Sequence, residues 1–482
     1  MKRRAGQAGR IIGEALHQLG RMAMLLLLLL LLSVVLIGFR LSQGPLQIPH
    51  LASRLATAVS GQGISVEMQK ADLAWAGYHK GGGVPLYLQL GGISVRNAEG
   101  VELVTIPSAR LVVLPAALFG GAAPILVSGT NARFPGSAVP VSLRAAIRLG
   151  AGFQLARADL LVTLGPGRLG AGDNSLPITS GGFTLAVTPR AVVLSDGNLH
   201  LAKSGQSAPL VGFTGHADLQ SQWQGSVTAT ADAVQAGDLA AYWPPTLFGQ
   251  TRHWVTTNIT AGAARDAAFT IALAAPRNLA SVAMTSISGS FTGQDLTLTW
   301  LPHAAPITEL SGRFTVLDQD NALVTATAAR LGGLSLSSGN MKILDMNTHR
   351  PIGQLSVDVG GTVQDVIAVI NAPPLNLLRQ APPQIAPATG AVKATVTATI
   401  PLINKLLLED VTLHVGAALS NVALASPVTG LGFSGGTARL DATTHDIDVA
   451  GSAQFAGEPA TLQVKASFDQ KGAQSFTLSS RA

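Results

Sequence analysis

The chain has 482 residues, of which 47% are hydrophobic, 12% are charged and 5% are aromatic, and it contains 53 glycines. Because it has no cysteine, disulfides, thiolate metal sites and cysteine nucleophiles are excluded. The net charge of +6 is concentrated at the N-terminus, since residues 1–40 hold six of the 32 basic and one of the 26 acidic residues, leaving 26 and 25 for the rest. A body this close to neutral, without a basic stripe interleaved with aromatics, argues against nucleic acid as a partner.

The first predicted element is a membrane-spanning helix over residues 22–39, whose sequence MAMLLLLLLLLSVVLIGF carries no charge. Such a helix rises about 27 Å, close to the hydrocarbon thickness of a bilayer. A cleaved signal peptide is the alternative, but a small-x-small cleavage site should then follow, and RLSQGPLQIPH provides none. Because the basic tail 1–21 precedes the run, we expect a cytoplasmic N-terminus and a single-pass anchor, with the body across the membrane, which in a bacterium would be the periplasm.

A short helix is predicted next, within IPHLASRLATAVSG. Leu51, Leu55 and Val59 share one face at helical spacing, and Gly61 is expected to end the helix. We interpret it as a cap over the first strands; the alternative is a gate through which lipids enter.

Strict alternation of apolar and polar residues then dominates, as in VKATVTATI (392–400). This period of two predicts half-buried β-strands, separated by turn signals about every 8–12 residues, as in an antiparallel meander. Very roughly 30–40 strands are expected, and a single ladder of that size would reach about 140–190 Å. Alternation assigns nine residues to the oily faces of three strands: Leu86, Leu88, Leu90, Val392, Val396, Ile400, Leu462, Val464 and Phe468.

Two interruptions of the strand pattern look helical. In residues 237–259, Asp238 is a plausible N-cap and Pro244-Pro245 a stop signal. A second short helix is predicted near Gln364–Ile370, followed by a Pro-rich stretch that marks the best internal boundary, near 372–390. A weaker boundary is predicted near 205–210.

Enzyme motifs are poorly matched. GPGRLG (165–170) fits a dinucleotide-binding glycine pattern, but turn residues and not a helix follow it. GFSGG (432–436) formally fits a nucleophile elbow, yet strand patterns follow, so Ser434 is interpreted as a turn residue. No two of the ten histidines have metal-ligand spacing. The sequence therefore predicts no enzyme, no cofactor and no metal.

The oily face of a long meander must be covered. A second sheet could pack on it, helices could cover it (although few are predicted), or the sheet could bend into a trough that holds lipid chains. Periodicity alone leaves these alternatives open.

Several long segments resemble the AsmA-like family of bacterial envelope proteins, most closely its YhdP-like branch. The similarity is carried by residues 45–121, from PLQIPHLASRLATAVSG to IPSARLVVLPAALFGG, and by YWPPTLFGQTRHWVTTNITAG, ELSGRFTVLDQDNALVTATAARLGG and VGGTVQDVIAVINAPPL. The resemblance implies a single N-terminal transmembrane helix followed by a mainly β, elongated and curved antiparallel sheet that forms a taco-like groove with a few short helices. It also implies that phospholipids move between the inner and outer membranes with their acyl chains along the groove. YhdP-like proteins are usually much longer than this chain.

The predicted organisation follows from these observations: residues 1–21 form a cytoplasmic tail, 22–39 the anchor, 40–205 an AsmA-like N-terminal β region, 206–372 a YhdP-like central β region, 373–390 a Pro-rich linker and 391–482 a C-terminal β region. A partner protein or a second copy is expected at the C-terminal edge, because an open terminal strand is normally capped. The alternative function is a structural or regulatory scaffold for outer-membrane assembly that conducts no lipid.

Overall fold

The fold was determined from a computed structural model. It describes residues 24, 27–33, 35–60, 64–75, 86–97, 99–113, 125–135, 137–150, 154–170, 172–246, 249–277, 281–301, 303–373, 388–403, 406, 410–428, 431–455, 457–467 and 475–480. The chain is mainly β, with 67% of it in strands, and forms one long open antiparallel sheet with few helices. This confirms the predicted class.

The N-terminal apolar run is helical wherever it is described, and the helix continues to residue 42. The described leucines at 27–32 and 36 are exposed, whereas Leu41 beyond the run is buried. In the described part of the chain, no helix combines the length and the apolar character that crossing a membrane requires.

The sheet contains 24 strands in the described residues. In the N-terminal half they are β1 (Leu46–Gln47), β2 (Ile64–Trp75), β3 (Leu86–Asn97), β4 (Glu102–Val113), β5 (Ile125–Ala132), β6 (Val141–Leu149), β7 (Leu155–Leu164), β8 (Gly167–Leu169), β9 (Leu176–Val187), β10 (Ala191–Leu201), β11 (Leu210–Leu219) and β12 (Trp223–Gln235). In the C-terminal half they are β13 (Ile259–Ala275), β14 (Ala283–Leu298), β15 (Ile307–Val316), β16 (Ala322–Leu331), β17 (Leu334–Leu344), β18 (Ile352–Thr362), β19 (Ala388–Pro401), β20 (Thr412–Val428), β21 (Leu431–Thr443), β22 (Asp446–Phe455), β23 (Glu458–Ser467) and β24 (Ser475–Ser480).

The topology is a meander, in which nearly every strand pairs antiparallel with the next strand along the chain. The exception is the short β8, which pairs with the start of β9 while β9 continues the main ladder beside β7. At about 4.8 Å per strand the ladder is roughly 105 Å long. The expectation of 30–40 strands was therefore too high for the described residues, because the strands are longer than predicted.

The helices are short and lie in three places along the sheet: α2 (Leu51–Val59) before β2, then η4 (Ala236–Asp238), α4 (Leu239–Tyr242) and α5 (Gly249–Asn258) before β13, and α6 (Val363–Asn371) before β19. A further single turn, η3 (Gly172–Asn174), precedes β9. Because β2, β13 and β19 run in the same direction through the meander, all three helical connections lie along the same long edge of the sheet, which we call the helical edge. Both predicted helices near 51–59 and 364–370 are confirmed.

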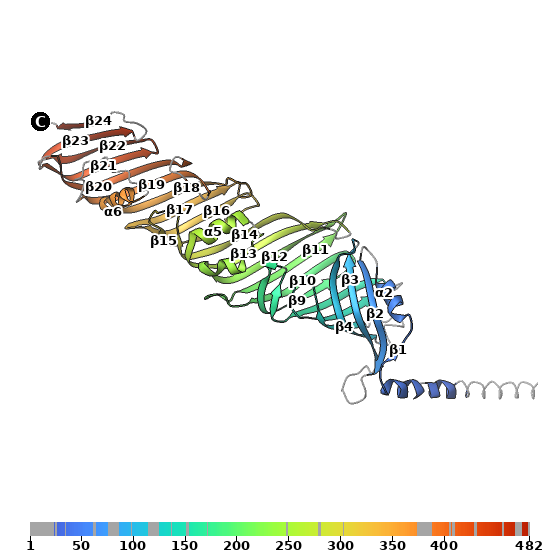
Figure 1. Ribbon diagram of the computed structural model, residues 1–482. Helices are drawn as coiled ribbons and strands as arrows, with labels where there is room; N and C mark the ends of the chain where they lie inside the picture. The colour runs from blue at the N-terminus through green and yellow to red at the C-terminus, as the bar shows by residue number, and fades with distance from the viewer. Residues whose placement is uncertain are drawn as a thin grey trace, which may run out of the picture.

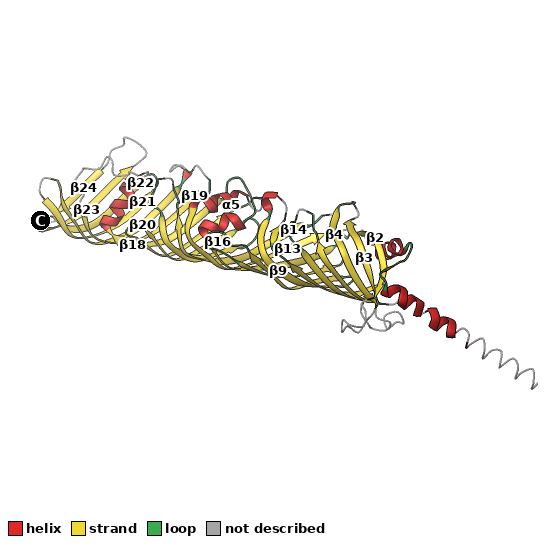
Figure 2. Cartoon of the chain, turned by 60° about the horizontal axis from the view of Figure 1, so that its bottom comes forward, coloured by secondary structure: helices red, strands yellow, loops and turns green. Residues whose placement is uncertain are grey.

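Figure 1 shows the strands stacked into an elongated body with the N-terminal helix at one end and the C-terminus at the other. Figure 2 shows that the sheet is curled along its length and that the helices lie at one edge of the curl. The chain exposes 29439 Å², whereas a compact protein of its mass would expose about 17,000 Å². Much of the sheet is thus a single layer without a second layer packed on it.

The ladder crosses the predicted linker 373–390 without a break, since β18 pairs with β19 over eleven residue pairs. Residues 374–387 of that linker lie outside the described part. The predicted domain boundaries remain predictions.

Candidate functional site

The candidate site is the face of the sheet that carries the alternating apolar side chains, which we call the apolar face. A first row of directly opposed residues crosses twelve strands, from β2 to β14, without one polar side chain. It runs Leu73, Leu88, Leu111, Val127, Ala145, Leu160, Leu185, Leu194, Gly215, Val227, Ile271 and Ile287.

A second row continues the apolar face from β14 to β20, and a third extends it to β22. The second runs Phe291, Phe314, Val324, Met341, Leu355, Ala398 and Leu413, and the third runs Val396, Val415, Ala442 and Ile447. Because side chains on one face of a strand recur every second residue, Ile287 and Phe291 share a face of β14, as Val396 and Ala398 do on β19. The three rows therefore form one continuous apolar surface.

Helices cover this face at its N-terminal end and near its C-terminal third. Leu51, Ala52 and Leu55 of α2 pack on the core of β2–β10, where Leu90 and Ile178 are 3% and 2% exposed. Val363, Val366 and Ile367 of α6 pack on Val392 and its neighbours in β19 and β20. Between these helices, large apolar side chains such as Phe269, Phe291 and Phe314 are only half-buried.

Aromatic pairs lie on the same face. The rings of Phe291 and Phe314 stack with centroids 5.1 Å apart, and those of Phe433 and Phe455 are 5.0 Å apart. Phe183 and Phe213 lie on β9 and β11, with β10 between them, yet their centroids are 5.9 Å apart. Strands two apart are separated by about 9.6 Å, so these rings lean together over Gly197. Such convergence is what a face on the inside of a curl produces.

The structure places eight of the nine predicted oily residues on the apolar face. Leu88 and Leu90 belong to the first core, and Leu86, two residues before, is 43% exposed. Val392, Val396 and Ile400 follow one another along β19, with Val392 7% exposed. On β23, Leu462 and Val464 are half-buried opposite Gly451 and Val449. Phe468 lies outside the described residues.

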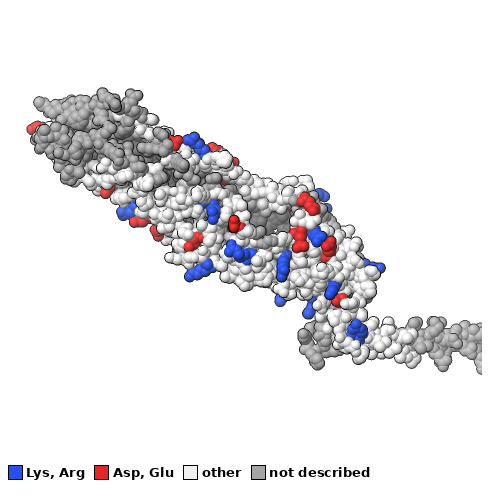
Figure 3. Space-filling view, in the orientation of Figure 1, with Lys and Arg blue, Asp and Glu red and all other residues white. Residues whose placement is uncertain are grey.

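The opposite face is polar along most of the sheet. Thr228 and Thr270 share a hydrogen bond of 2.9 Å, Thr395 donates to Asp358, and Lys465 forms an ion pair of 2.9 Å with Asp448. Hydrogen bonds from Ser338 and Thr395 hold the pKa of Asp358 below its ordinary value. In Figure 3, charged side chains are scattered singly or in small groups over the visible side of the molecule.

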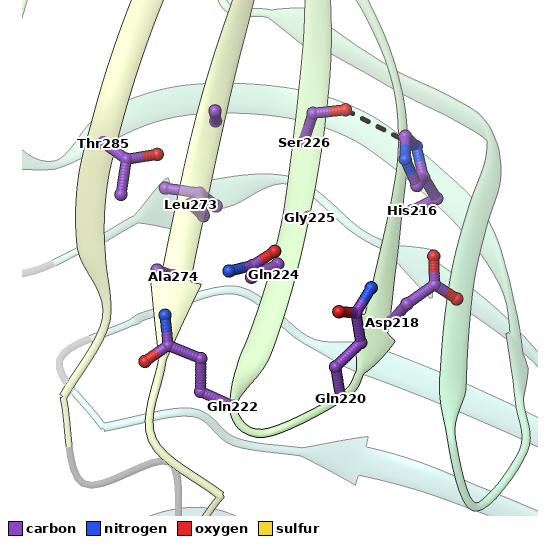
Figure 4. A pocket seen from close by; sticks show the side chains of 11 residues that line it. His216, Asp218, Gln220, Gln222, Gln224, Gly225, Ser226, Leu273, Ala274 and Thr285 are labelled. Atoms are coloured by element: carbon purple, nitrogen blue, oxygen red, sulfur yellow. Dashed lines mark hydrogen bonds between the residues drawn. The ribbon is translucent and has the colours of Figure 1, made fainter.

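A polar depression of about 530 Å³ lies on this opposite face over β11–β14 (Figure 4). It contains Ser226 with its Oγ 3.4 Å from Nδ1 of His216, and Asp218 also lines it. The resemblance to a catalytic triad is superficial, since among the described contacts Asp218 makes no hydrogen bond to His216 and all three residues lie on an open strand surface. No group of three potential metal ligands occurs in the described residues.

One polar cluster, at the helical edge, was not predicted from the sequence. Asp238 stands at the N-cap position of α4 as predicted, but its side chain does not cap the helix. Its carboxylate accepts hydrogen bonds from the backbone N–H of Gln206 and from the N–H and hydroxyl of Ser207. These bonds, led by that of the Ser207 hydroxyl, lower the pKa of Asp238.

Tyr242 completes this cluster. Its hydroxyl accepts from the N–H of Ser204 and lies 2.7 Å from the Ser207 carbonyl oxygen, to which it donates. Burial raises the pKa of Tyr242 above its ordinary value. The cluster ties α4 to the β10–β11 loop, and we call it the Asp238 clip. Sequence spacing could not reveal it, because Ser207 and Asp238 are about thirty residues apart.

One other prediction needs correction. Ser434 is not a turn residue but lies in β21 at a register shift, next to Gly435 with φ of 60°. The predicted stop at Pro244-Pro245 is confirmed, since α4 ends at Tyr242. A separate helix, α5, follows, and Arg252 of α5 donates hydrogen bonds to the carbonyl oxygens of Trp243 and Ala240.

Comparison of the chain with protein-family models, with curated proteins and with solved structures returned no match.

Proposed function

We propose that this protein carries phospholipids along the apolar face of its sheet, anchored in the bacterial inner membrane by residues 22–39 and with its body in the periplasm. The curled sheet acts as a taco-like groove in which acyl chains lie on the apolar face while headgroups stay in water. The observation that supports this best is the continuity of the three apolar rows from β2 to β22. No bond is made or broken, and the proposal needs no cofactor, no metal and no catalytic residue.

The energetic argument rests on this continuity. Each CH₂ group moved from water to an apolar surface gains about 0.8 kcal/mol. A wall that stays apolar from strand to strand keeps that gain nearly constant, so a lipid can slide without returning its chains to water. A polar break in the rows would create a barrier of several kcal/mol for a lipid with two chains.

The half-burial of the large side chains supports the same proposal. Phenylalanines in a sandwich core are normally buried, yet those on β13–β15 remain half-buried in a chain of unusually large exposed surface. A face of this kind is stable in water only when something apolar covers it, and acyl chains fit a surface of small aliphatic side chains.

The test is native mass spectrometry of the full chain, extracted in a mild detergent and analysed for co-purifying phospholipid. We expect several phospholipids per chain. The variant Val396→Asp, which places a carboxylate in the third apolar row, should carry markedly less lipid, because an ionised carboxylate against acyl chains has no compensating partner. Thr397→Asp is the matched control one residue along on the polar face, and it should keep the wild-type lipid load.

Absence of lipid from the wild-type chain would contradict the proposal. The alternative function, a scaffold for outer-membrane assembly that conducts no lipid, would then be the better explanation. Thermal unfolding of both variants separates the remaining possibilities. If Val396→Asp unfolds the whole chain while Thr397→Asp does not, Val396 belongs to a packed core and not to a groove. A partner protein or second copy that continues the sheet beyond β24 remains part of the proposal, and nucleic acid does not.

A further inference from the structure

The polar face changes character over strands β4–β10, on the side of the sheet opposite to the groove. Leu126, Leu161 and Val193 are there 42%, 45% and 46% exposed, whereas the same face of β19 carries lysine and threonines. Large exposed apolar side chains that gather on an otherwise polar surface mark interaction sites. We call this region the outer patch. It consists of Val112, Leu126, Ala146, Asp159, Leu161, Ala186 and Val193 on β4–β10.

The ladder register aligns Leu126 and Val193 into a strip, and Leu161 lies two residues from it, opposite Arg144. Val112 is opposite Leu126, which is opposite Ala146, and after Asp159 the strip continues through Ala186 to Val193. Six strands give five steps of about 4.8 Å, so the strip is about 24 Å long. A depression of about 470 Å³ lies along it, lined among others by Val112, Leu126, Ala146 and Leu161.

Arginines border the strip on both sides. Arg110 and Arg144 lie two residues from it toward the helical edge, and Arg148 and Arg157 lie two residues from it on the other side. The single carboxylate in the strip, Asp159, is already bound by Arg157 at 2.7 Å, which holds its pKa low. In the described residues neither Arg144 nor Arg148 has a carboxylate within ion-pair distance.

We propose that the outer patch binds an amphipathic α-helix of a partner protein, with acidic residues on both flanks of its apolar stripe. The dimensions agree: Arg144 and Arg148 are four strand residues apart, or about 13 Å, which matches the 10–12 Å diameter of a helix. A strip of about 24 Å accommodates roughly 16 helical residues. Guanidinium groups on each side would pair with the flanking carboxylates, while the leucines and valines cover the stripe.

A membrane surface fits this patch less well. In Figure 1 the strands from β4 to β10 lie progressively farther from the N-terminal helix, so the strip runs away from the end of the molecule at which that helix leaves. A second copy of this chain is also a poorer match, because the patch itself supplies four arginines and one carboxylate that is already paired. The inference is independent of lipid carriage, since the outer patch and the apolar face are on opposite sides of the same strands.

The test uses the full chain in detergent micelles and two designed helical peptides of roughly 16 residues with the same leucine stripe. One peptide carries glutamates on both flanks of the stripe and the other carries lysines. We expect fluorescence anisotropy to show binding of the glutamate peptide and at least tenfold weaker binding of the lysine peptide. Arg144→Glu with Arg148→Glu should reverse this preference, and Leu126→Gln with Leu161→Gln should weaken the binding of the glutamate peptide.

The matched control is Lys393→Glu with Arg439→Glu, which makes the same change in net charge at exposed residues of distant strands and should leave binding unchanged. Equal affinity for both peptides, or no effect of the Arg144 and Arg148 reversal in a chain that unfolds at the wild-type temperature, would overturn the proposal. Displacement of the glutamate peptide by phosphatidylglycerol vesicles would instead assign the patch to a membrane. Self-association that Leu161→Gln abolishes would assign it to a second copy.

Discussion

At the scale of single residues, a step of one position decides on which side of this sheet a side chain lies. Val396 faces Val357 and Val415 in the apolar row, and Thr397 faces Ser356 and His414 on the other side. This alternation is a property of the extended backbone, so it could be read from the sequence before any partner strand was known. That is why eight of the predicted oily residues fall on one face although they come from three distant strands.

Polar contacts between distant residues could not be predicted in this way. Asp238 was correctly expected at a helix start, but its carboxylate binds a loop that precedes it by about thirty residues. Only the ladder from β10 to β13 brings the loop and the helix to the same edge. The function of such a residue depends on the register of strands between the partners, which no local pattern contains.

The Asp238 clip makes a prediction about pH. Because the folded-state pKa of Asp238 is lowered from its ordinary 3.8, the stabilisation that its carboxylate contributes is present above that value and is lost as the pH falls through the lower, folded-state pKa. Asp238→Asn should therefore speed hydrogen exchange of the Gln206 and Ser207 amides at neutral pH. The difference from the wild type should disappear in acid, once both proteins lack the charge.

Hydrogen exchange measured by mass spectrometry at matched pH checks this prediction. Asp218→Asn, on the open polar face, is the control and should not change the β10–β11 loop. A difference between Asp238→Asn and wild type that is the same at all pH values would show that the loss of charge is not the cause.

At the scale of elements, the helices were predictable and the strand boundaries were not. The number of strands was overestimated because turn signals occur inside strands. Asp196-Gly197 is a strong hairpin signal, yet it lies in the middle of β10, with Asp196 at φ of 53° and a register shift beside it. Asp266, Asp295 and Asn421 also adopt positive φ at register shifts within β13, β14 and β20. These residues form β-bulges, which bend a strand and increase its twist without ending it.

Helix α6 shows why the helices were easier to predict. Thr362 accepts a hydrogen bond from the backbone N–H of Asp365, and the Asp365 carboxylate accepts one from the N–H of Thr362, a reciprocal capping box that lies entirely within four residues. The apolar side chains of the helix then pack on Val392. Start signal and packing face are both local, so the sequence predicted the helix to within a residue or two.

Loss of this cap should loosen α6 from the apolar face. We expect Thr362→Ala to destabilise the helix by about 1 kcal/mol, because the backbone N–H of Asp365 loses its acceptor and the Asp365 carboxylate loses the hydrogen bond from the Thr362 hydroxyl. Thr362→Ser keeps the hydroxyl and should behave as wild type. The measurement is the hydrogen-exchange protection of residues 363–371, and unchanged protection in Thr362→Ala would mean that packing on Val392 alone holds the helix.

At the scale of the whole molecule, the antiparallel ladder converts a local alternation into a surface roughly 105 Å long. Each strand needs only a period of two and the correct register with its neighbour for the apolar rows to join. The class of the fold could therefore be predicted from composition and periodicity. The curl and the bulges that produce it could not, because they depend on a few residues of positive φ distributed over many strands.

In the proposed conduit a lipid passes the strands one after another, so a block at one strand should remove lipid only from the strands beyond it. A carrier whose strands each take up lipid directly from solution would not show this difference. Ile271 lies in the first apolar row, between Val227 and Ile287. If lipids enter at the N-terminal end, Ile271→Asp should leave lipid on the strands before it and exclude lipid from those after it. Thr270→Asp, one residue away on the polar face, should have no such effect.

The measurement is photocrosslinking to lipid from unnatural amino acids placed at Phe213 on β11 and at Leu440 on β21, in the full chain reconstituted into vesicles. In Ile271→Asp we expect crosslinks at 213 to persist and those at 440 to fall several-fold, because a lipid passing residue 271 would have to place its chains against a charge. Equal loss at both positions would indicate a general disruption of the sheet, which thermal unfolding would reveal. Undiminished crosslinking at 440 would mean that lipids reach the C-terminal strands directly from solution, and the face would then be a set of independent binding sites and not a conduit.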